Sequence, residues 1–308
     1  MQMSSNPLDV VIVSAIGVDT NIYLYGQDID FSVEANFSQN LDYVGQAGGY
    51  SSRGFARLGY QTAFAGYIGE DFNGKFVASE LASDGIESLL FIDPQGTRRS
   101  INFMNRDGIR KNFYDAKGAM NLKAENSLIQ ALFQRARLAH FNIENWARYL
   151  LPLAREAGLK ISCDIQDIVA LDDPYRRDFI DAADFLFFSG VNFNDPTPLI
   201  QELLRRNLNQ IIVVGMGKKG CALGSRDGIR FFPPVEMAEA VVDTNGAGDA
   251  LTVGFLSSYC LEGYSLEDSV LRGQIAARYT CTIKASSADL INRGELNYYF
   301  SKIKRNGT

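Results

Sequence analysis

One short stretch near the C-terminus, AVVDTNGAGDALTVGFL over residues 240–256, combines residue types that suit group transfer. Asp249 follows the small residues Gly246, Ala247 and Gly248, and apolar residues at helical spacing come directly after it. The first N–H groups of a helix have no partner within it and attract anions. Asp249 beside them could accept a proton from an attacking hydroxyl. The alternative is a tightly packed helix start that needs its glycines only for close packing, and the local pattern leaves both open.

Composition excludes several classes of function. The chain has 308 residues, 46% of them hydrophobic, and a net charge of −6, which argues against a nucleic-acid or anionic-membrane binder. No apolar run approaches the roughly 18 residues of a membrane span. The segment before the first apolar run has no basic region, so we expect a first strand there and not a signal peptide. The single histidine, His140, excludes a His-rich metal site, and we expect it to be structural. The four distant cysteines form no CxxC pair, as in a cytoplasmic protein with reduced thiols.

The order of apolar segments predicts an α/β fold. From about residue 120 the chain alternates helical and strand patterns, which predicts a doubly wound, mostly parallel sheet with helices on both faces. Residues 22–46 alternate apolar and polar side chains, and residues 98–115 have the pattern of a hairpin. We expect these amphipathic strands to form a small sheet over one end of the large one. Residues 246–263 are expected to form one long helix that ends at Gly263. Ligands of such sheets bind at the carboxyl ends of the strands, where Asp249 is then expected.

The sequence resembles the ribokinase-like (PfkB-type) carbohydrate kinases along most of its length. DTNGAGD at 243–249 is similar to the family's C-terminal signature D-T-x-G-A-G-D, and GGYSSRGFARLG at 48–59 to its di-glycine helix. GYIGEDFNGKF at 66–76, VNFND at 191–195 and VVGMGKKGCAL at 213–223 are similar to further family blocks in the family's order.

The resemblance implies a doubly wound α/β domain with a β-sheet lid that transfers the γ-phosphoryl of ATP to an alcohol. We expect one domain over 1–308, with the lid at about 20–47 and 96–116. Asp249 would be the general base, and the backbone of 246–248 the anion hole. Nucleotide contacts would come from Asn192, Gly215, Gly217, Lys219, Gly220 and Thr244. For Lys219, a solvated turn lysine is the alternative.

Substrate contacts are implied at the other end of the chain. Asp19 matches the family's substrate carboxylate, with a loop-capping role as the alternative, and Gly48 and Gly49 would let substrate approach the backbone. Arg53 stands where family members often have Asn. Together with Arg98 and Arg99 of the expected lid, it could clamp an acidic substrate, because arginine suits carboxylate and phosphate. Alternatively, Arg53 turns outward into solvent.

The implied metal sites also depart from the family pattern. Asn192 and Asp195 replace N-x-x-E, so Mg²⁺ would be held through water by the shorter Asp195. Asp164 and Gln166 stand where many members show D-x-N. TIKASSAD at 282–289 replaces a glycine-containing segment that helps many members hold a monovalent cation near Asp243, so K⁺ activation is expected only weakly.

A glycine-rich motif after one of the expected strands could indicate a dinucleotide site. GMGKKG at 215–220 satisfies G-x-G-x-x-G, but a dinucleotide site needs a helix next. The following CALGSRDGIRFF alternates and turns, so we expect a hairpin and no dinucleotide site.

The hypothesis is therefore an ATP- and Mg²⁺-dependent kinase of a sugar or sugar derivative. A nucleoside kinase of the same family and a non-catalytic sugar- or nucleotide-binding regulator are the alternatives. Trp146, Phe103, Phe113 and Tyr114 are expected to serve packing, although a lid aromatic could contact a nucleobase. The expected partners are small molecules, and pairing of lids into a homodimer is an arrangement that the resemblance allows.

Overall fold

The N-terminal apolar run folds as strand β1 (Val10–Val13), whose four side chains are all buried. The computed structural model describes residues 6–105, 110–168, 170 and 172–306. β1 lies inside a nine-stranded sheet, paired in parallel with β4 on one side and β8 on the other. The sheet is parallel except at one edge, where β11, β12 and β13 pair antiparallel.

The order of the strands across this sheet is β13-β12-β11-β10-β9-β8-β1-β4-β5. Besides β1, its members are β4 (Thr62–Ile68), β5 (Glu87–Ile92), β8 (Leu138–Asn142), β9 (Lys160–Asp167), β10 (Phe185–Ser189), β11 (Ile211–Gly215), β12 (Cys221–Ser225) and β13 (Gly228–Phe232). The prediction of a mostly parallel sheet is confirmed.

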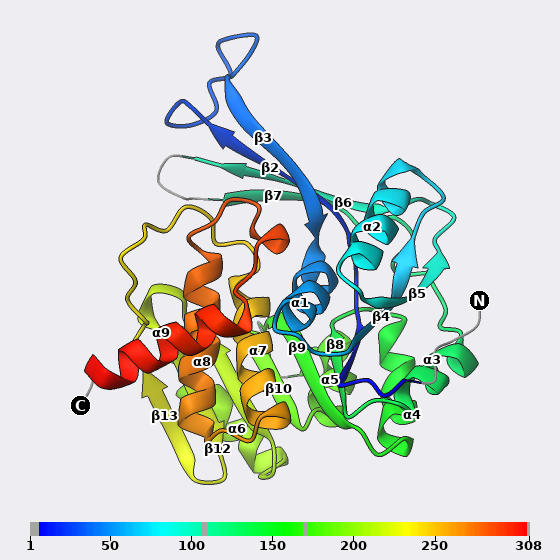
Figure 1. Cartoon of the computed structure of the whole chain (residues 1–308), viewed down its shortest axis with the longest axis vertical. Helices are drawn as coiled ribbons and strands as arrows, with labels where there is room; N and C mark the ends of the chain where they lie inside the picture. Colours follow the sequence, from blue (N-terminus) through cyan, green and yellow to red (C-terminus); the bar gives the residue numbers. More distant parts are fainter. Residues whose placement is uncertain (1–5, 106–109, 169, 171, 307–308) are drawn as a thin grey trace.

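Helices cover both faces, so the sheet is doubly wound (Figure 1). One face packs against α3 (Asn126–Phe133), α4 (Leu151–Glu156), α5 (Pro174–Ala182) and α6 (Thr197–Arg206). The other packs against α1 (Gln46–Arg57), α2 (Phe72–Ser83), α7 (Ala247–Leu256), α8 (Leu266–Thr280) and α9 (Arg293–Asn306). Short 3-10 turns span Ala147–Leu150, Gly217–Lys219 and Ser286–Ala288.

Local sequence signals set several helix ends. Asp71 caps α2 by accepting a hydrogen bond from the Gly74 N–H, and Ser265 caps α8 in the same way. The helix expected over 246–263 is interrupted: α7 ends at Leu256, and a π-helical turn runs over Ser257–Leu261. Gly263 then turns the chain at φ 76°.

A second sheet of four strands, the lid sheet, rises above the carboxyl ends of the central strands (Figure 1). Its order is β3 (Ser38–Gly45), β2 (Gly17–Leu24), β6 (Arg98–Met104) and β7 (Arg110–Asp115). β2 pairs antiparallel with β3, and β6 with β7, as expected from their alternating patterns. The two pairs are joined by β2 and β6, which run parallel to each other. The turn expected between β6 and β7 lies outside the described residues.

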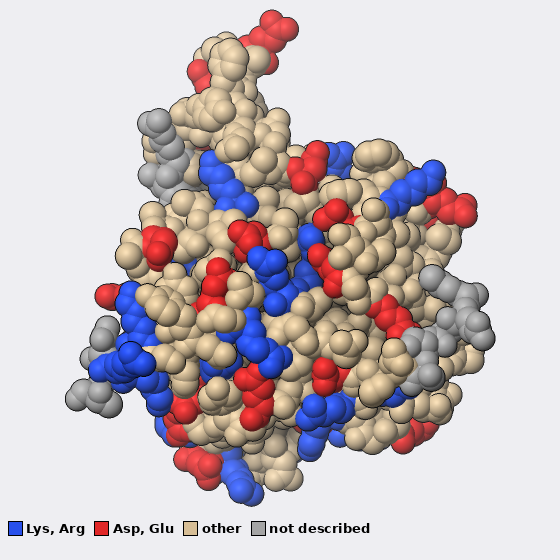
Figure 2. Space-filling view, viewed as in Figure 1, with Lys and Arg blue, Asp and Glu red and all other residues tan. Residues whose placement is uncertain are grey.

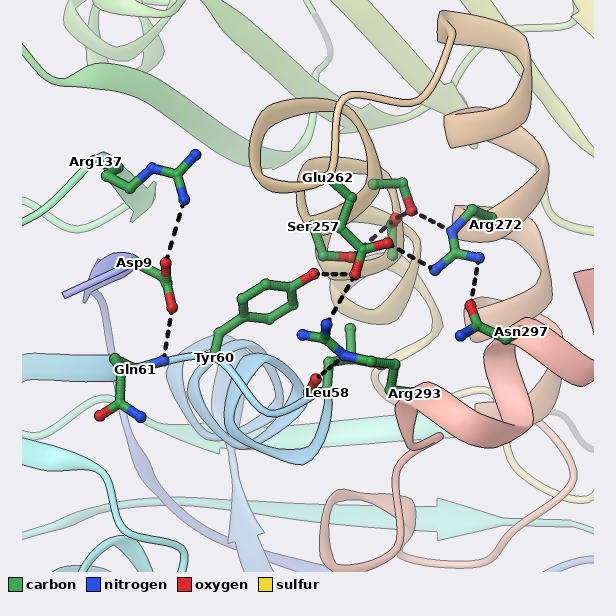
Figure 3. A network of polar contacts seen from close by, with 12 residues as sticks. Asp9, Leu58, Tyr60, Gln61, Arg137, Ser257, Glu262, Arg272, Arg293 and Asn297 are labelled. Atoms are coloured by element: carbon green, nitrogen blue, oxygen red, sulfur yellow. Dashed lines mark hydrogen bonds and ion pairs between the residues drawn. The ribbon is translucent and has the colours of Figure 1, made fainter.

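A charged network ties the C-terminal helices to the end of α1 (Figure 3). The carboxylate of Glu262 accepts a hydrogen bond of 2.5 Å from the Tyr60 hydroxyl and lies 3.2 Å from Arg272 and 3.4 Å from Arg293. Arg272 is 1% exposed, whereas Glu262 and Arg293 lie at the surface, so the network joins the interior to the surface.

The surface carries mixed charge, with basic and acidic side chains interspersed over the face in Figure 2. Among the described residues, no helix is long and apolar enough to cross a membrane. The four cysteines are free thiols.

Candidate active site

The GAG segment forms the turn into helix α7. Gly246 adopts the left-handed conformation with φ 74°, and a Cβ there would lie 2.2 Å from the Tyr50 ring, so only glycine fits. A Cβ added at Gly248 would meet nothing within 4 Å. The backbone at the start of α7 is therefore open on the side of Gly248, where its N–H groups can face an anion.

Asp249 lies in the first turn of α7, half-buried. Burial, followed by the negative charge of Asp164, raises the pKa of Asp249 well above its ordinary value, and the positive charge of Arg110 opposes this shift. A carboxyl with a raised pKa is a stronger proton acceptor than an ordinary one when ionised.

Two further carboxylates belong to the same electrostatic environment. Asp164 lies at the carboxyl end of β9, where burial raises its pKa to about 6 despite a hydrogen bond of 2.8 Å from the Gln166 N–H. Asp19 lies in β2, and burial raises its pKa to about 6 as well. Hydrogen bonds from Gln46 and the positive charge of Arg110 limit the shift at Asp19.

Gln46 holds Asp19 in place. Its Nε2 donates to Asp19 Oδ1 at 2.6 Å and to Ser100 Oγ at 2.8 Å. Gln46 has φ 61°, which is rare for a residue with a side chain. Gly45 precedes it because a Cβ there would lie 2.2 Å from the Asp19 carboxyl carbon. Sequence reasoning missed Gln46, and only its position before the di-glycine could have pointed to it.

The lid sheet turns a polar face toward these carboxylates. Strand register places Asp19 beside Ser100 and Asn21 beside Asn102, so these side chains share one face, the inner face. Asn102 donates to Asn21 at 2.9 Å and accepts from Asn112 of β7 at 2.9 Å. The inner face is thus lined with amides and hydroxyls around one carboxylate.

Arg110 of β7 lies at the site, although it was not among the residues predicted from the sequence. It shares the inner face through its pairing with Met104, and its Nη1 donates to the Asn245 side chain, just ahead of the GAG turn. Its charge acts on both Asp19 and Asp249. Sequence reasoning missed it because the strand register, which decides the face, could not be read.

Comparisons with known proteins agree with this geometry. Residues 179–292 match the model of the pfkB family carbohydrate kinase. This range includes the GAG turn and Asp249. Over 297 residues the chain is 28% identical to the acarbose 7(IV)-phosphotransferase of Actinoplanes sp., covering 95% of this chain and 98% of that protein. It is 24% identical over 288 residues to the ribokinase of Arabidopsis thaliana, covering 85% and 73%.

The chain is thus similar to the pfkB carbohydrate kinases, whose model matches residues 179–292, and its relatives and structural neighbours include ribokinase-family kinases.

Solved structures agree with that similarity. A microbiome-derived acarbose kinase, Mak1, superimposes with a TM-score of 0.89 at 27% identity, covering 96% of this chain and all of that one. A putative ribokinase from Agrobacterium tumefaciens superimposes with a TM-score of 0.82 at 20% identity, covering 97% and 99%, which shows the fold. The chain is therefore an ATP-dependent carbohydrate kinase with the ribokinase-like fold.

Arg53 does not have the surroundings expected for a substrate clamp. Its Nε lies 2.6 Å from Asp84 and its Nη2 lies 3.2 Å from Glu80, so two carboxylates of the α2 region already neutralise it. It is 7% exposed, so the alternative of an arginine turned into solvent is wrong.

Arg99 lies on the other face of the lid sheet. Its neighbour across β2 is Val18, and its guanidinium donates to Thr20 Oγ1 at 3.0 Å, whereas Asp19 points to the inner face. The structure thus contradicts a substrate contact by Arg99, because strand side chains alternate between faces. The arginine on the inner face is Arg98.

Gly48 and Gly49 have a packing reason for being glycine. A Cβ at Gly48 would lie 2.3 Å from the Ala15 carbonyl oxygen, and one at Gly49 would lie 3.1 Å from that of Val44. The start of α1 therefore needs both residues to approach the strands. Substrate contact at these two positions stays a prediction.

The expected nucleotide residues surround the turn after β11. Gly217 and Gly220 have φ 56° and 89°, and a Cβ at Gly220 would lie 2.0 Å from the Phe232 carbonyl oxygen. Lys219 is exposed there, Gly215 ends β11, and Thr244 is exposed ahead of the GAG turn. The strands that follow, β12 and β13, form the expected antiparallel hairpin, so no helix completes a dinucleotide fingerprint. The ATP contacts themselves stay predictions.

The expected metal residues lie in the loop between β10 and α6. Asn192 donates to Asp167 Oδ2 and to the Ile168 carbonyl, each at 3.1 Å, and Asp195 accepts from the Thr197 N–H at 2.9 Å. Within the described part of the chain, no three His, Cys, Asp or Glu residues cluster to hold a metal. Mg²⁺ in kinases is often held by one or two carboxylates, phosphates and water, so the donor set here suits a water-mediated contact.

Hydrogen-bond donors of the protein surround the carboxylate of Asp243. Its carboxylate accepts hydrogen bonds from Asn21 at 2.7 Å, Tyr23 at 2.5 Å, Asn245 at 2.7 Å and the Ala285 N–H at 3.3 Å. These contacts join the lid sheet to the GAG turn, and nothing in them favours a monovalent cation.

Four of the five residues expected to pack do so. His140 is fully buried, hydrogen-bonded to Ser162 at 3.0 Å, and burial lowers its pKa to about 3, so it is neutral. Trp146 packs edge-on against Tyr67, and Phe103 packs against Phe113 on the outer face of the lid sheet. Tyr114 instead belongs to the inner face, because it is paired with Ser100.

Proposed function

We propose that this kinase transfers the γ-phosphoryl group of ATP to an alcohol, most simply a CH2–OH, of a neutral sugar or sugar-derived oligosaccharide. The observation that carries the proposal is the placement of Asp249 in the first turn of α7. There it lies beside the open backbone of the GAG turn, while the polar inner face of the lid sheet provides the acceptor side.

In this mechanism Asp249 takes the proton of the acceptor hydroxyl as its oxygen attacks the γ-phosphorus. The bond from that phosphorus to the β–γ bridging oxygen breaks, and ADP leaves with the electron pair. The N–H groups of residues 246–248 face the negative charge of the phosphoryl group. The raised pKa of Asp249 suits proton acceptance from an alcohol.

Two cationic contributions complete the arrangement. Arg110, donating to Asn245, is placed to neutralise phosphoryl charge from the lid side. Asn192 and Asp195 would hold Mg²⁺ through water, and the ion would neutralise negative charge of the phosphates. Gly215, Gly217, Lys219, Gly220 and Thr244 would position the nucleotide.

A neutral acceptor fits better than an acidic one. Arg53 is paired with two carboxylates, Arg99 lies on the outer face, and Arg98 is paired with Glu144 at 2.7 Å. The surface around Asp19 consists of amides and hydroxyls, which suit vicinal hydroxyls. Acarbose is the first candidate, because two relatives with nearly full-length coverage are named for it.

The two alternatives have weaker support. A nucleoside acceptor would gain from an aromatic stacking platform. Phe103 and Phe113 lie on the outer face of the lid sheet, which leaves Tyr114 of the inner face as the candidate among these three. A non-catalytic regulator would not need a carboxylate with a raised pKa beside an open helix start.

Pairing of lid sheets into a homodimer is a separate proposal. The lid tip bears the exposed aromatic residues Phe31 and Phe37, 92% and 82% exposed, and forms the narrow projection at the top of Figure 2. Analytical ultracentrifugation should give a dimer that Phe31→Ser combined with Phe37→Ser converts to a monomer. A wild-type monomer refutes the proposal.

The test of the function is ADP release from Mg·ATP across acarbose, ribose, fructose, sugar acids, sugar phosphates and nucleosides, with Asp249→Asn as the blank. We expect a neutral saccharide to give the highest kcat/KM. A nucleoside or an acidic sugar as the best acceptor would overturn the proposed substrate class. No acceptor above the blank would favour the regulator.

A further inference from the structure

Several buried polar atoms at the base of the lid sheet make no hydrogen bond of good geometry among the described residues. They are the three guanidinium nitrogens of Arg98, which lies beside Glu144, and both amide atoms of Asn142. These two residues are 1% and 2% exposed. A buried polar group without a hydrogen bond costs about 1–3 kcal/mol, so two such residues need an explanation.

Arg98 faces the acceptor side. It is the first residue of β6, paired with Gly17, and lies two residues from Ser100, which binds the same Gln46 that holds Asp19. Period-two alternation therefore puts Arg98 on the inner face.

Asn142 reaches the same region from the large sheet. It is the last residue of β8 and is paired in register with Asp164 of β9. Side chains in register on parallel strands point to the same face, and Asp164 acts electrostatically on the proposed base Asp249. Asn142 thus lies at the carboxyl end of the sheet, where ligands of such folds bind.

The charge of Arg98 is already balanced. Its Nη1 lies 2.7 Å from Glu144 Oε1, but none of its nitrogens has an acceptor in hydrogen-bonding geometry within the described chain. Glu144 and Tyr114 are its polar neighbours. A guanidinium whose charge is met but whose N–H groups are not all in hydrogen bonds of good geometry suits neutral oxygen acceptors better than a second anion.

We propose that Arg98 and Asn142 hydrogen-bond hydroxyl groups of the acceptor away from the reacting one, and so select polyhydroxylated acceptors over deoxy analogues. The inference rests on the proposed function and deepens it. A site built to bind a hydroxyl rejects an analogue lacking it, because buried polar groups are then left unpaired.

The matched test uses the same substitution at two adjacent arginines. Arg98→Lys keeps the charge beside Glu144 but loses the planar fork, whereas Arg99→Lys makes the same change on the outer face. With the best acceptor among acarbose, fructose and ribose, Arg98→Lys should raise the acceptor KM at least about tenfold, the equivalent of about 1.4 kcal/mol. The ATP KM should stay within about twofold, and Arg99→Lys should leave both constants unchanged.

A second variant keeps the test decisive if Arg98→Lys does not fold. Asn142→Val should raise the acceptor KM in the same selective way. An unchanged acceptor KM in a folded variant, or equal rises for acceptor and ATP, overturns the inference and leaves Arg98 as an anchor of the lid sheet.

Calorimetry separates this inference from the function on which it rests. Asp249→Asn, loaded with a non-hydrolysable ATP analogue, should bind acarbose, fructose or ribose, and adding Arg98→Lys should weaken that binding. Binding that depends on Arg98 without wild-type turnover overturns the proposed function alone. No binding of any of the three sugars overturns the inference, and turnover with binding insensitive to Arg98 overturns it as well.

Discussion

Arg98 and Arg272 are equally buried, each 1% exposed, yet their surroundings differ completely. Arg272 donates to Ser258 at 2.7 Å and Asn297 at 2.9 Å, pairs with Glu262 at 3.2 Å, and lies over the rings of Tyr264 and Phe300. Arg98 has a carboxylate beside it and no hydrogen bond in good geometry among the described residues.

The comparison distinguishes an arginine whose hydrogen bonds are made within the fold, Arg272, from one that we propose binds a ligand, Arg98. The Arg272 network in Figure 3 joins α8, α9 and the π-helical turn to Tyr60 after α1, so its hydrogen bonds are all made by the chain itself. Around the proposed acceptor site the chain leaves polar atoms open. The two arginines are equally buried and equally charged, and they differ in whether their N–H groups form hydrogen bonds of good geometry within the chain.

The largest effect should come from breaking the satisfied network. Arg272→Met removes a fully buried guanidinium and its hydrogen bonds to Ser258 and Asn297, and each hydrogen bond to a charged group contributes about 1.5–3 kcal/mol to the free energy of unfolding. Urea denaturation measures this loss. Arg98→Met combined with Glu144→Gln removes both charges together and should cost less, and the reverse order of the two losses would contradict the comparison. The acceptor KM of Arg272→Met should be unchanged.

A smaller effect is expected at the lid cation. Arg110→Met removes the donor to Asn245 and the positive charge acting on Asp249, and a charged hydrogen bond contributes about 1.5–3 kcal/mol. We therefore expect kcat to fall about ten- to a hundredfold. Lys111→Met on the outer face is the control. Equal losses in both variants would show that Arg110 has no special role.

The smallest effect is a shift in pH dependence. Asp249 accepts a proton only when ionised, so the rate falls as pH falls through its pKa. The negative charge of Asp164 raises that pKa, so Asp164→Asn should lower it and move the acid limb of kcat/KM to lower pH. A pH–rate profile with the limb unmoved, or moved to higher pH, would remove Asp164 from the surroundings of the base.

Most of the fold could be predicted from the sequence because its signals are local. The buried strand at Val10–Val13, the glycine turns and the alternation of helix and strand each follow from a few adjacent residues. The parallel pairing of β2 with β6 could not be predicted, since it joins segments about 80 residues apart. The π-helical turn after Leu256 depends on tertiary contacts in the same way.

The site residues likewise include some that a local sequence pattern reveals and some that it does not. Asp249 and the GAG turn could be found because residue type and position in a helix coincide in one short segment. Arg99 was chosen and Arg110 missed because a one-residue difference in register moves a side chain to the other face of a strand. The pairing of Arg53 with Asp84 and Glu80 depends on how α1 and α2 pack, which no local pattern encodes.

The most direct test of the account is a single-turnover measurement of phosphoryl transfer from ATP to the best acceptor, in the wild type and in Asp249→Asn. We predict that the variant slows transfer at least about a hundredfold, the low end of general-base contributions, while the Kd for ATP and the Tm stay unchanged. Transfer within about tenfold of the wild-type rate would contradict the assignment of Asp249 as the base.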